Sequence, residues 1–278
     1  MNMIKKISNE RFQERSESLA SAKKPYGSVL IKAVQILDLL SQRSEPQTMS
    51  EISKYTDITM STTNKILDTL DLIGFVSRDS QTKEFSLGPR LIQLANASFI
   101  QFDIARETYP TLKRLYERVN TTVNLGMHQD NQVLFVNKFT ERDSSEETIS
   151  RIGFTQPIYC TAMGKAILAK FSKEEREEYL KRVELTPKTE HTIIDKEILE
   201  DEIKLTQQRG YAIDDREAED NIYCIGTTFQ VPGDSNYYAF SISSSYDQVD
   251  GGRHDQIVSE LMKTKTVIEY QLANTQEG

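Results

Sequence analysis

Residue types that mark particular protein classes are scarce in this chain of 278 residues, which has no tryptophan, two cysteines and three histidines. The cysteines, Cys160 and Cys224, are too few for the disulfide framework of a small secreted domain. The histidines, His128, His191 and His254, lie far apart and lack the short spacing of metal ligands. The sequence therefore predicts neither a metal site nor a cofactor.

Long apolar segments are also missing. No stretch approaches the ~18 uncharged apolar residues that a membrane-spanning helix needs. The chain begins Met-Asn-Met-Ile-Lys-Lys and then turns polar, without the apolar run of a signal peptide. With hydrophobic residues at 37% and charged residues at 27%, the composition is that of a soluble globular protein. We expect a cytoplasmic location and no membrane partner.

The formal net charge is −8, which at first argues against a general nucleic-acid binder. The charge is unevenly distributed, however. By count, residues 1–26 carry a net +3, residues 27–90 a net −1 and residues 91–278 a net −10. The acidity therefore lies in the C-terminal two thirds. The N-terminal third is mildly basic, so DNA binding there would depend on specific contacts more than on charge.

Residues 27–88 show the pattern of three short helices followed by a β-hairpin. The spacing of apolar residues predicts helices over 29–41, 48–55 and 59–74, the second opened by a capping box of Thr48 and Glu51. Short extended runs at 75–78 and 84–87 flank a polar turn. This order predicts a winged helix-turn-helix domain. The preceding residues, 1–26, form either a flexible polar tail or a basic arm that touches DNA phosphates.

After the hairpin, the pattern predicts a linker helix over 89–101 and a second domain over 102–274. Asp103 can cap a new helix over 104–119, and Pro110 should disfavour an uninterrupted one. The remainder alternates strands and helices, which indicates an α/β or α+β domain. The expected strands are 122–128, 133–139, 147–152, 211–214, 222–230 and 237–244, and the expected helices 162–170, 173–181, 195–208 and 253–272.

The N-terminal part of the third helix is the segment that would enter the major groove of DNA. Its short polar side chains and one lysine suit base edges and phosphates, and the positive end of the helix favours phosphate. Two basic residues in the predicted wing can reach the adjacent backbone. The DNA-binding candidates are therefore Ser61, Thr62, Thr63, Asn64, Lys65, Arg78 and Lys83. The alternative is that these are ordinary solvated residues of a small helical domain.

The whole pattern resembles the IclR family of bacterial transcriptional regulators over about residues 27–272. The resemblance rests on several segments in the right order, of which the last is the strongest: Ser61-Thr62-x-x-Lys65-Ile66-Leu67-x-x-Leu70, Gly74-Phe75-Val76, Phe85-Ser86-Leu87-Gly88, Thr161-Ala162-Met163-Gly164-Lys165-Ala166-Ile167-Leu168-Ala169, and Gly210-x-x-x-Asp214-x-x-Glu217 followed by Cys224. The chain departs from the family at Met60, at Lys65 and around Asn221, which leaves operator and effector open. Lys65 keeps the charge of the usual arginine but loses its planar fork.

The resemblance implies a DNA-binding repressor with a GAF- or PAS-like effector domain, acting as a homodimer or a dimer of dimers. It also implies that Ala162, Met163, Asp214, Cys224, Ser241 and Ser243 surround the effector. The residues themselves add detail. Strand 237–244 alternates, so Tyr238, Phe240 and Ile242 should face the core while the two serines face a cavity. Hydroxyls and free helix-start amides suit a small organic acid.

Two other functions are compatible with the residues. Cys224 could be the nucleophile of a cysteine-dependent enzyme, although no histidine lies near it in sequence to activate the thiol. Cys160 and Cys224 could instead pair as a thiol redox sensor. Each candidate effector residue also has a plain structural interpretation, such as a buried small side chain or the solvent face of a strand. The favoured interpretation is a regulator that is not an enzyme.

Overall fold

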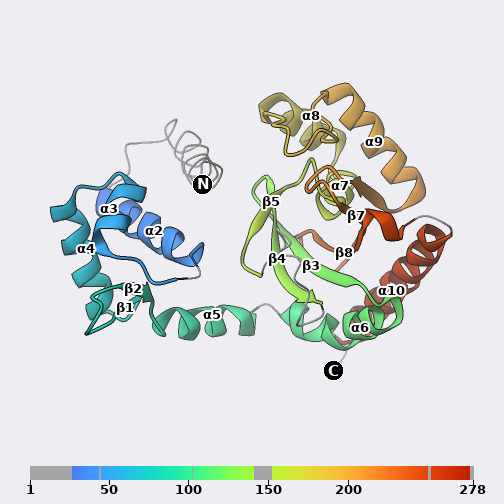
Figure 1. Ribbon diagram of the computed structural model, residues 1–278. Helices are drawn as coiled ribbons and strands as arrows, with labels where there is room; N and C mark the ends of the chain where they lie inside the picture. Colours follow the sequence, from blue (N-terminus) through green and yellow to red (C-terminus); the bar gives the residue numbers. More distant parts are fainter. Residues whose placement is uncertain (1–26, 44, 102, 141–151, 250–251, 276–278) are drawn as a thin grey trace. The chain divides into compact units, whose positions relative to one another are not determined.

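A computed structural model describes residues 27–43, 45–101, 103–140, 152–249 and 252–275 (Figure 1). The chain divides into two compact units, one up to residue 101 and the other from residue 102 onward. The segment 1–26, expected to be a flexible tail, lies outside the described residues. So does most of the strand expected over 147–152.

The N-terminal unit has the expected three helices and hairpin. Helices α2 (Ser28–Ser41), α3 (Met49–Thr56) and α4 (Met60–Leu72) precede strands β1 (Val76–Arg78) and β2 (Phe85–Leu87). The strands pair antiparallel, and helix α5 (Arg90–Gln101) follows them. One apolar core joins α2, α3, α4, β1 and β2; its buried members are Ile36, Leu39, Leu40, Ile52, Ile58, Ile66, Leu67, Leu70, Val76 and Phe85.

Local sequence signals set the ends of these helices. The capping box is present, since Thr48 N–H donates to Glu51 Oε2 (2.8 Å) and Glu51 N–H donates to Thr48 Oγ1 (3.3 Å). Gly74, just beyond α4, has a φ of 77°, a left-handed conformation that glycine adopts without strain. The chain therefore leaves α4 sharply and enters the hairpin.

The second unit is built on one six-stranded antiparallel sheet. Its strands lie in the order β5-β4-β3-β8-β7-β6. Their bounds are β3 (Thr122–Gln129), β4 (Gln132–Phe139), β5 (Thr155–Pro157), β6 (Ala212–Asp215), β7 (Ile222–Phe229) and β8 (Tyr238–Ser245). The sequence did not predict β5, which is only three residues long and lacks a run of alternating apolar residues.

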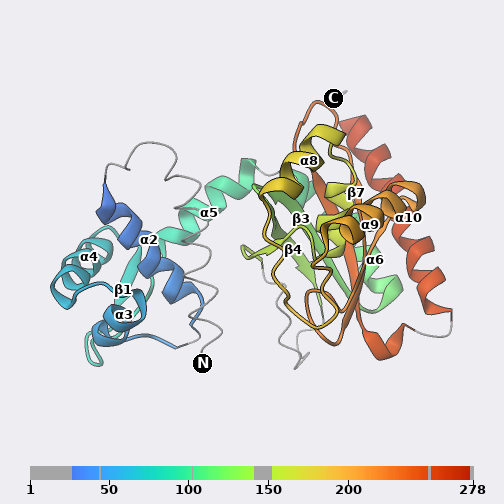
Figure 2. The ribbon, with the colours of Figure 1, turned by 90° about the horizontal axis from the view of Figure 1, so that it is seen from above.

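Helices cover both faces of this sheet (Figures 1 and 2). Helices α6 (Asp103–Val119) and α10 (Arg253–Thr275) pack on one face, where Leu115 and Leu261 join Phe240 in a buried cluster. The expected helix over 104–119 is present, and α6 continues through Pro110. On the other face lie α7 (Ala162–Leu168), α8 (Lys173–Arg182) and α9 (Lys196–Arg209). A short 3-10 helix, η1 (Tyr246–Gln248), follows β8.

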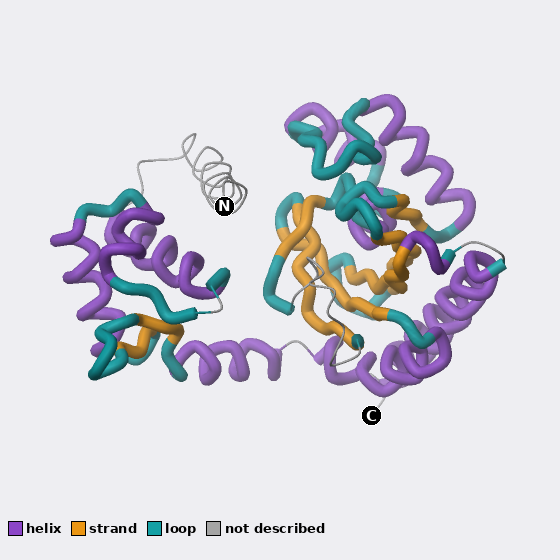
Figure 3. The backbone as a smooth tube through the Cα atoms, viewed as in Figure 1, coloured by secondary structure: helices purple, strands orange, loops and turns teal. Residues whose placement is uncertain are grey.

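Figure 3 shows the layers of this domain, with strands and helices in separate colours. The two faces of its sheet carry different side chains. The face toward α6 and α10 carries large apolar side chains from β3 and β8, among them Val123, Leu125, Phe240 and Ile242. The face toward α7 carries smaller and polar residues from the same strands. This second face, called the polar face below, carries the buried polar side chains Asn124, Asp214 and Ser241.

Candidate functional site

The exposed surface of α4 is the first candidate site, and it carries short polar side chains. Ser61, Asn64 and Lys65 are exposed, and Thr62 is partly buried. Asn64 Nδ2 donates to Asp68 Oδ2 (2.9 Å), one turn along the same surface. Thr59 occupies the N-cap position, but its side chain makes no capping hydrogen bond. This end of α4 thus presents hydroxyl, amide and ammonium groups to solvent.

Thr63 does not belong to that surface, and the sequence-based assignment is wrong for this residue. Its side chain is 0% exposed, and Thr63 Oγ1 donates to the carbonyl of Ile58 (3.3 Å). The reason is helical phase. Thr63 is three and four residues before Ile66 and Leu67, so it lies on the same buried stripe. Thr63 therefore holds α4 against the preceding turn and is not available to a base edge.

The hairpin presents two further basic side chains. Arg78, at the end of β1, is exposed, with its guanidinium 5.3 Å from the centre of the Phe85 ring. Lys83 lies in the turn with a φ of 61°, and its ammonium donates to the carbonyl of Ser80. Asp79 accepts the backbone N–H groups of Gln81 and Thr82, which shapes the turn. Both cations are on the surface that a wing offers to a polyanion.

The second candidate site lies on the polar face of the large sheet. Asp214 on β6 is directly opposite Cys224 on β7, and Cys224 is directly opposite Ser243 on β8. Residues opposite each other share a face, so these three side chains form a row across the sheet. Cys224 Sγ donates to Ser243 Oγ (3.1 Å), and both residues keep part of their surface accessible. Asp214 and Cys224 therefore lie on neighbouring strands.

A second polar row runs beside the first. Asn124 on β3 is opposite Ser241 on β8, which is opposite Gly226 on β7. A Cβ at Gly226 would come within 2.9 Å of the backbone of Ala162 and Met163, so only glycine lets α7 approach here. The predicted alternation of β8 is confirmed, since Tyr238, Phe240 and Ile242 belong to the opposite core. Asn124 was missed by sequence reasoning, because one asparagine in a strand carries no motif.

Helix α7 begins beside these rows. Ala162 and Met163 are its first two residues, and both are buried. Gly164 N–H is not one of the free helix-start amides that the sequence suggests, because it donates to Thr161 Oγ1 (3.1 Å), which caps the helix. A Cβ at Gly164 would lie 2.3 Å from backbone atoms of Ile158. Glycine is therefore required for the close contact between α7 and the segment before it.

The carboxyl of Asp214 is held by the turn that follows β6. Asp214 Oδ1 accepts the backbone N–H groups of Glu217 (2.8 Å) and Ala218 (3.3 Å). Burial raises its pKa from the ordinary 3.8 to about 7, although the nearby Lys165 opposes the change. The group is thus balanced between its neutral and charged forms near neutral pH. A carboxyl in this state can donate a hydrogen bond when protonated.

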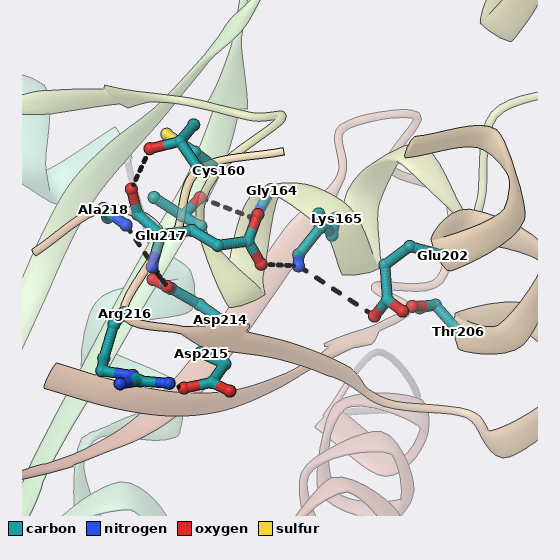
Figure 4. A network of polar contacts seen from close by, with 12 residues as sticks. Cys160, Gly164, Lys165, Glu202, Thr206, Asp214, Asp215, Arg216, Glu217 and Ala218 are labelled. Atoms are coloured by element: carbon teal, nitrogen blue, oxygen red, sulfur yellow. Dashed lines mark hydrogen bonds and ion pairs between the residues drawn. The ribbon is translucent and has the colours of Figure 1, made fainter. Parts of the chain in front are cut away.

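A buried ion pair lies next to Asp214 (Figure 4). Lys165 of α7 is 1% exposed, and its ammonium is bonded to Glu217 Oε1 and lies 4.0 Å from Glu202 Oε1 of α9. Glu202 also accepts a hydrogen bond from Arg209. Burial raises the pKa of Glu217, whereas Lys165 lowers it. The pair fixes the turn that carries Asp214 to the helix that carries Met163, and no sequence signal was assigned to it.

The two cysteines do not have the surroundings of reactive thiols. Burial raises the pKa of both Cys160 and Cys224, and the carboxyl of Asp214 raises them further. Both are free thiols. His254 is bonded to Tyr223, and His191 lies beside Glu190. Among the described residues, neither imidazole hydrogen-bonds to a cysteine thiol. The cysteine-enzyme and redox-sensor alternatives are not supported.

Among residues 27–43, 45–101, 103–140, 152–249 and 252–275, no group of three or more histidine, cysteine or acidic side chains could hold a metal ion. Within the same residues, no helix is both long and apolar enough to cross a membrane.

Comparison with known proteins identifies the two domains. Residues 97–270 match the family described as bacterial transcriptional regulator IclR C-terminal, and residues 29–80 match the IclR helix-turn-helix domain. A similar curated protein is the HTH-type transcriptional regulator XynR of Escherichia coli (strain K12). It is 27% identical over 219 residues, which cover 79% of this chain and 86% of that protein.

Solved structures show the same architecture. The IclR of Thermotoga maritima superposes with a TM-score of 0.74 at 29% identity, covering 89% of this chain and 99% of the other. An IclR homologue from Microbacterium hydrocarbonoxydans, solved in complex with 4-hydroxybenzoate, gives a TM-score of 0.76 at 22% identity, covering 88% and 99%. With its winged helix-turn-helix, its mixed α/β domain and family matches over most of its length, the chain belongs to the IclR family of DNA-binding transcriptional regulators.

Proposed function

We propose that the protein is a repressor that binds an operator through its winged helix and releases it in response to a small organic acid. The observation that carries the proposal is the combination of two surfaces on one chain. The first is the exposed polar end of α4 with its basic wing. The second is a row of hydroxyl, thiol and carboxyl groups on the inner face of the C-terminal sheet.

The proposed DNA contacts are the predicted residues without the buried Thr63, namely Ser61, Thr62, Asn64, Lys65, Arg78 and Lys83. Lys65 and the two wing cations are exposed, so each can neutralise a phosphate without leaving an existing buried ion pair. Ser61 and Asn64 lie on the same exposed surface of α4, where short donors and acceptors can reach base edges in the major groove. Few cations imply a modest non-specific affinity.

The proposed effector contacts are Ala162, Met163, Asp214, Cys224, Ser241 and Ser243. Their register places the last four on one face, and the start of α7 lies over Gly226 beside them. Lys138 pairs with Asn124 across β3 and β4 and so adds a cation to that face. Hydroxyl donors near a cation suit a carboxylate. The ligand of the Microbacterium homologue, an aromatic hydroxy acid, belongs to this chemical class.

Two further parts of the proposal follow from how operators are recognised. One winged helix reads only a few base pairs, so a two-fold dimer, or a dimer of dimers, is needed for a palindromic site.

Repression requires only that occupancy of the operator exclude the polymerase. Activation requires an additional protein contact, and we therefore favour repression.

Two assays test the proposal in parallel. In a gel-shift assay, the full chain should retain a duplex from upstream of its own coding sequence and not a shuffled duplex at the same salt concentration. In a thermal-shift screen of small aliphatic and aromatic acids, at least one acid should raise the melting temperature, since a ligand of the folded state stabilises it. Failure to retain any upstream duplex contradicts the regulator. Failure of every acid contradicts the effector class.

A further inference from the structure

Asn124 occupies the centre of the polar face, and its two amide atoms are used differently. Its side chain is 2% exposed. Asn124 Nδ2 donates to Ser243 Oγ (3.1 Å) and lies 3.5 Å from Ser241 Oγ, at the limit of a hydrogen bond. Asn124 Oδ1 is equally buried, and among the described residues it accepts no hydrogen bond. A buried amide oxygen without a donor is costly, so the site is incomplete as it stands.

The two hydrogen bonds to Ser243 determine whether its hydroxyl can donate or accept a further hydrogen bond. A serine hydroxyl has two lone pairs and one hydrogen. Asn124 Nδ2 and Cys224 Sγ both donate to Ser243 Oγ, each at 3.1 Å, and together they occupy both lone pairs. The only capacity that remains to Ser243 is its own O–H hydrogen. This hydroxyl can therefore donate to a neighbouring group but cannot accept from one.

We propose that Asn124 is the positioning residue that makes the effector site select an acid: its amide turns Ser243 into an obligate donor for a carboxylate oxygen. Asn124 Oδ1 then accepts a hydrogen bond from a hydroxyl elsewhere on the same ligand, so the site selects a hydroxy acid over the plain acid. This inference rests on the proposed function, because it concerns the specificity of the proposed effector site.

The replacement Asn124→Asp tests the polarity with almost no change in shape. When ionised, an aspartate offers only acceptors, so at a pH above its titration Ser243 would turn its hydrogen toward residue 124 and no longer toward the ligand. The new charge would also repel a carboxylate. The variant should therefore lose affinity for acids by roughly 10- to 100-fold, the effect of one charge-assisted hydrogen bond. Affinity for the matching primary amide, which can itself donate, should fall much less.

The measured quantity is the preference for an acid over its primary amide, because a merely structural defect would weaken both ligands alike. Calorimetric titration of the full chain would use three pairs: acetate and acetamide, benzoate and benzamide, and 4-hydroxybenzoate and 4-hydroxybenzamide. Asn137→Asp is the matched control, since Asn137 is directly opposite Leu125 and so lies on the other face of the same sheet. The control should keep the wild-type preference.

If Asn124→Asp does not fold, Asn124→Ala supplies the second test. It leaves one lone pair of Ser243 empty, so the hydroxyl is free to accept, and the preference for acids should fall roughly tenfold. An unchanged acid-to-amide preference in a folded variant overturns the role of Asn124 and leaves the proposed function intact. If no acid binds the wild-type chain, the proposed effector class fails, and this inference fails with it.

Discussion

The buried carboxyl of Asp214 gives the protein a pH dependence whose sign and size follow from its surroundings. Burial raises the pKa of Asp214 from 3.8 to about 7 in the folded chain. Between these two values the unfolded chain has released the proton while the folded chain keeps it. The unfolded state then binds fewer protons, so stability is complete below pH 4 and falls as the pH rises through 7.

The replacement Asp214→Asn removes this titration and keeps the local hydrogen bonds. An asparagine oxygen can still accept the backbone N–H groups of Glu217 and Ala218 that Asp214 Oδ1 accepts. At about 1.4 kcal/mol per pH unit, the wild-type chain should lose about 4 kcal/mol between pH 4 and pH 8 through this one group. The variant should lack that loss. The difference isolates Asp214, because every other group titrates in both proteins.

Urea denaturation of both proteins at a series of pH values, followed by far-ultraviolet circular dichroism, measures the difference. The two curves of unfolding free energy against pH should converge at low pH and diverge as the pH rises, with the variant above. Infrared spectra provide a check that needs no unfolding, since a protonated buried carboxyl has its own band, which should be present at pH 5. Parallel curves and an absent band would show that Asp214 is already ionised at pH 5 in the folded chain.

Two other substitutions test the remaining parts of the account. Lys165→Met leaves Glu217 buried without its cation and should destabilise the folded chain by about 3–5 kcal/mol. The double variant Lys165→Met, Glu217→Leu should recover most of that loss, because it leaves no unpaired buried charge. Equal losses in the single and double variants would contradict the importance of the ion pair. Lys65→Ala should reduce the slope of log affinity for DNA against log salt by about one per subunit, whereas Lys113→Ala, an exposed lysine on α6, should not. An unchanged slope in the Lys65→Ala variant would show that Lys65 does not contact DNA.

Local signals in the sequence are sufficient for much of the fold. The Thr48–Glu51 capping box and the left-handed Gly74 depend only on nearby residues, and both are present where the sequence places them. The alternation of β8 likewise separates Phe240 from Ser241, because the period of a strand is two and one face is fully covered by helices. In each case a short stretch of chain carries its own physical constraint.

Other features depend on residues far apart in the chain, and the sequence did not predict them. Asn124 meets Ser243 only because β3 pairs with β8, and Lys165 meets Glu217 only because α7 packs over β6 and β7. Two local signals were nonetheless present. Thr63 continues the stripe of Ile66 and Leu67, which marks it as buried. Lys165 stands within an otherwise apolar short helix, and such a helix is buried on all sides.

The proposed function requires that acid binding in the C-terminal unit weaken operator binding by the winged helix, and one titration measures that coupling. The affinity of the full chain for a fluorescent duplex from upstream of its own coding sequence would be measured by anisotropy, without and with a saturating acid that raises the melting temperature. Allosteric coupling commonly changes affinity about fivefold or more, so the acid should weaken operator binding by at least that factor. Because coupling free energies are reciprocal, the operator should weaken acid binding by the same factor. Equal operator affinity with and without the saturating acid would contradict the account.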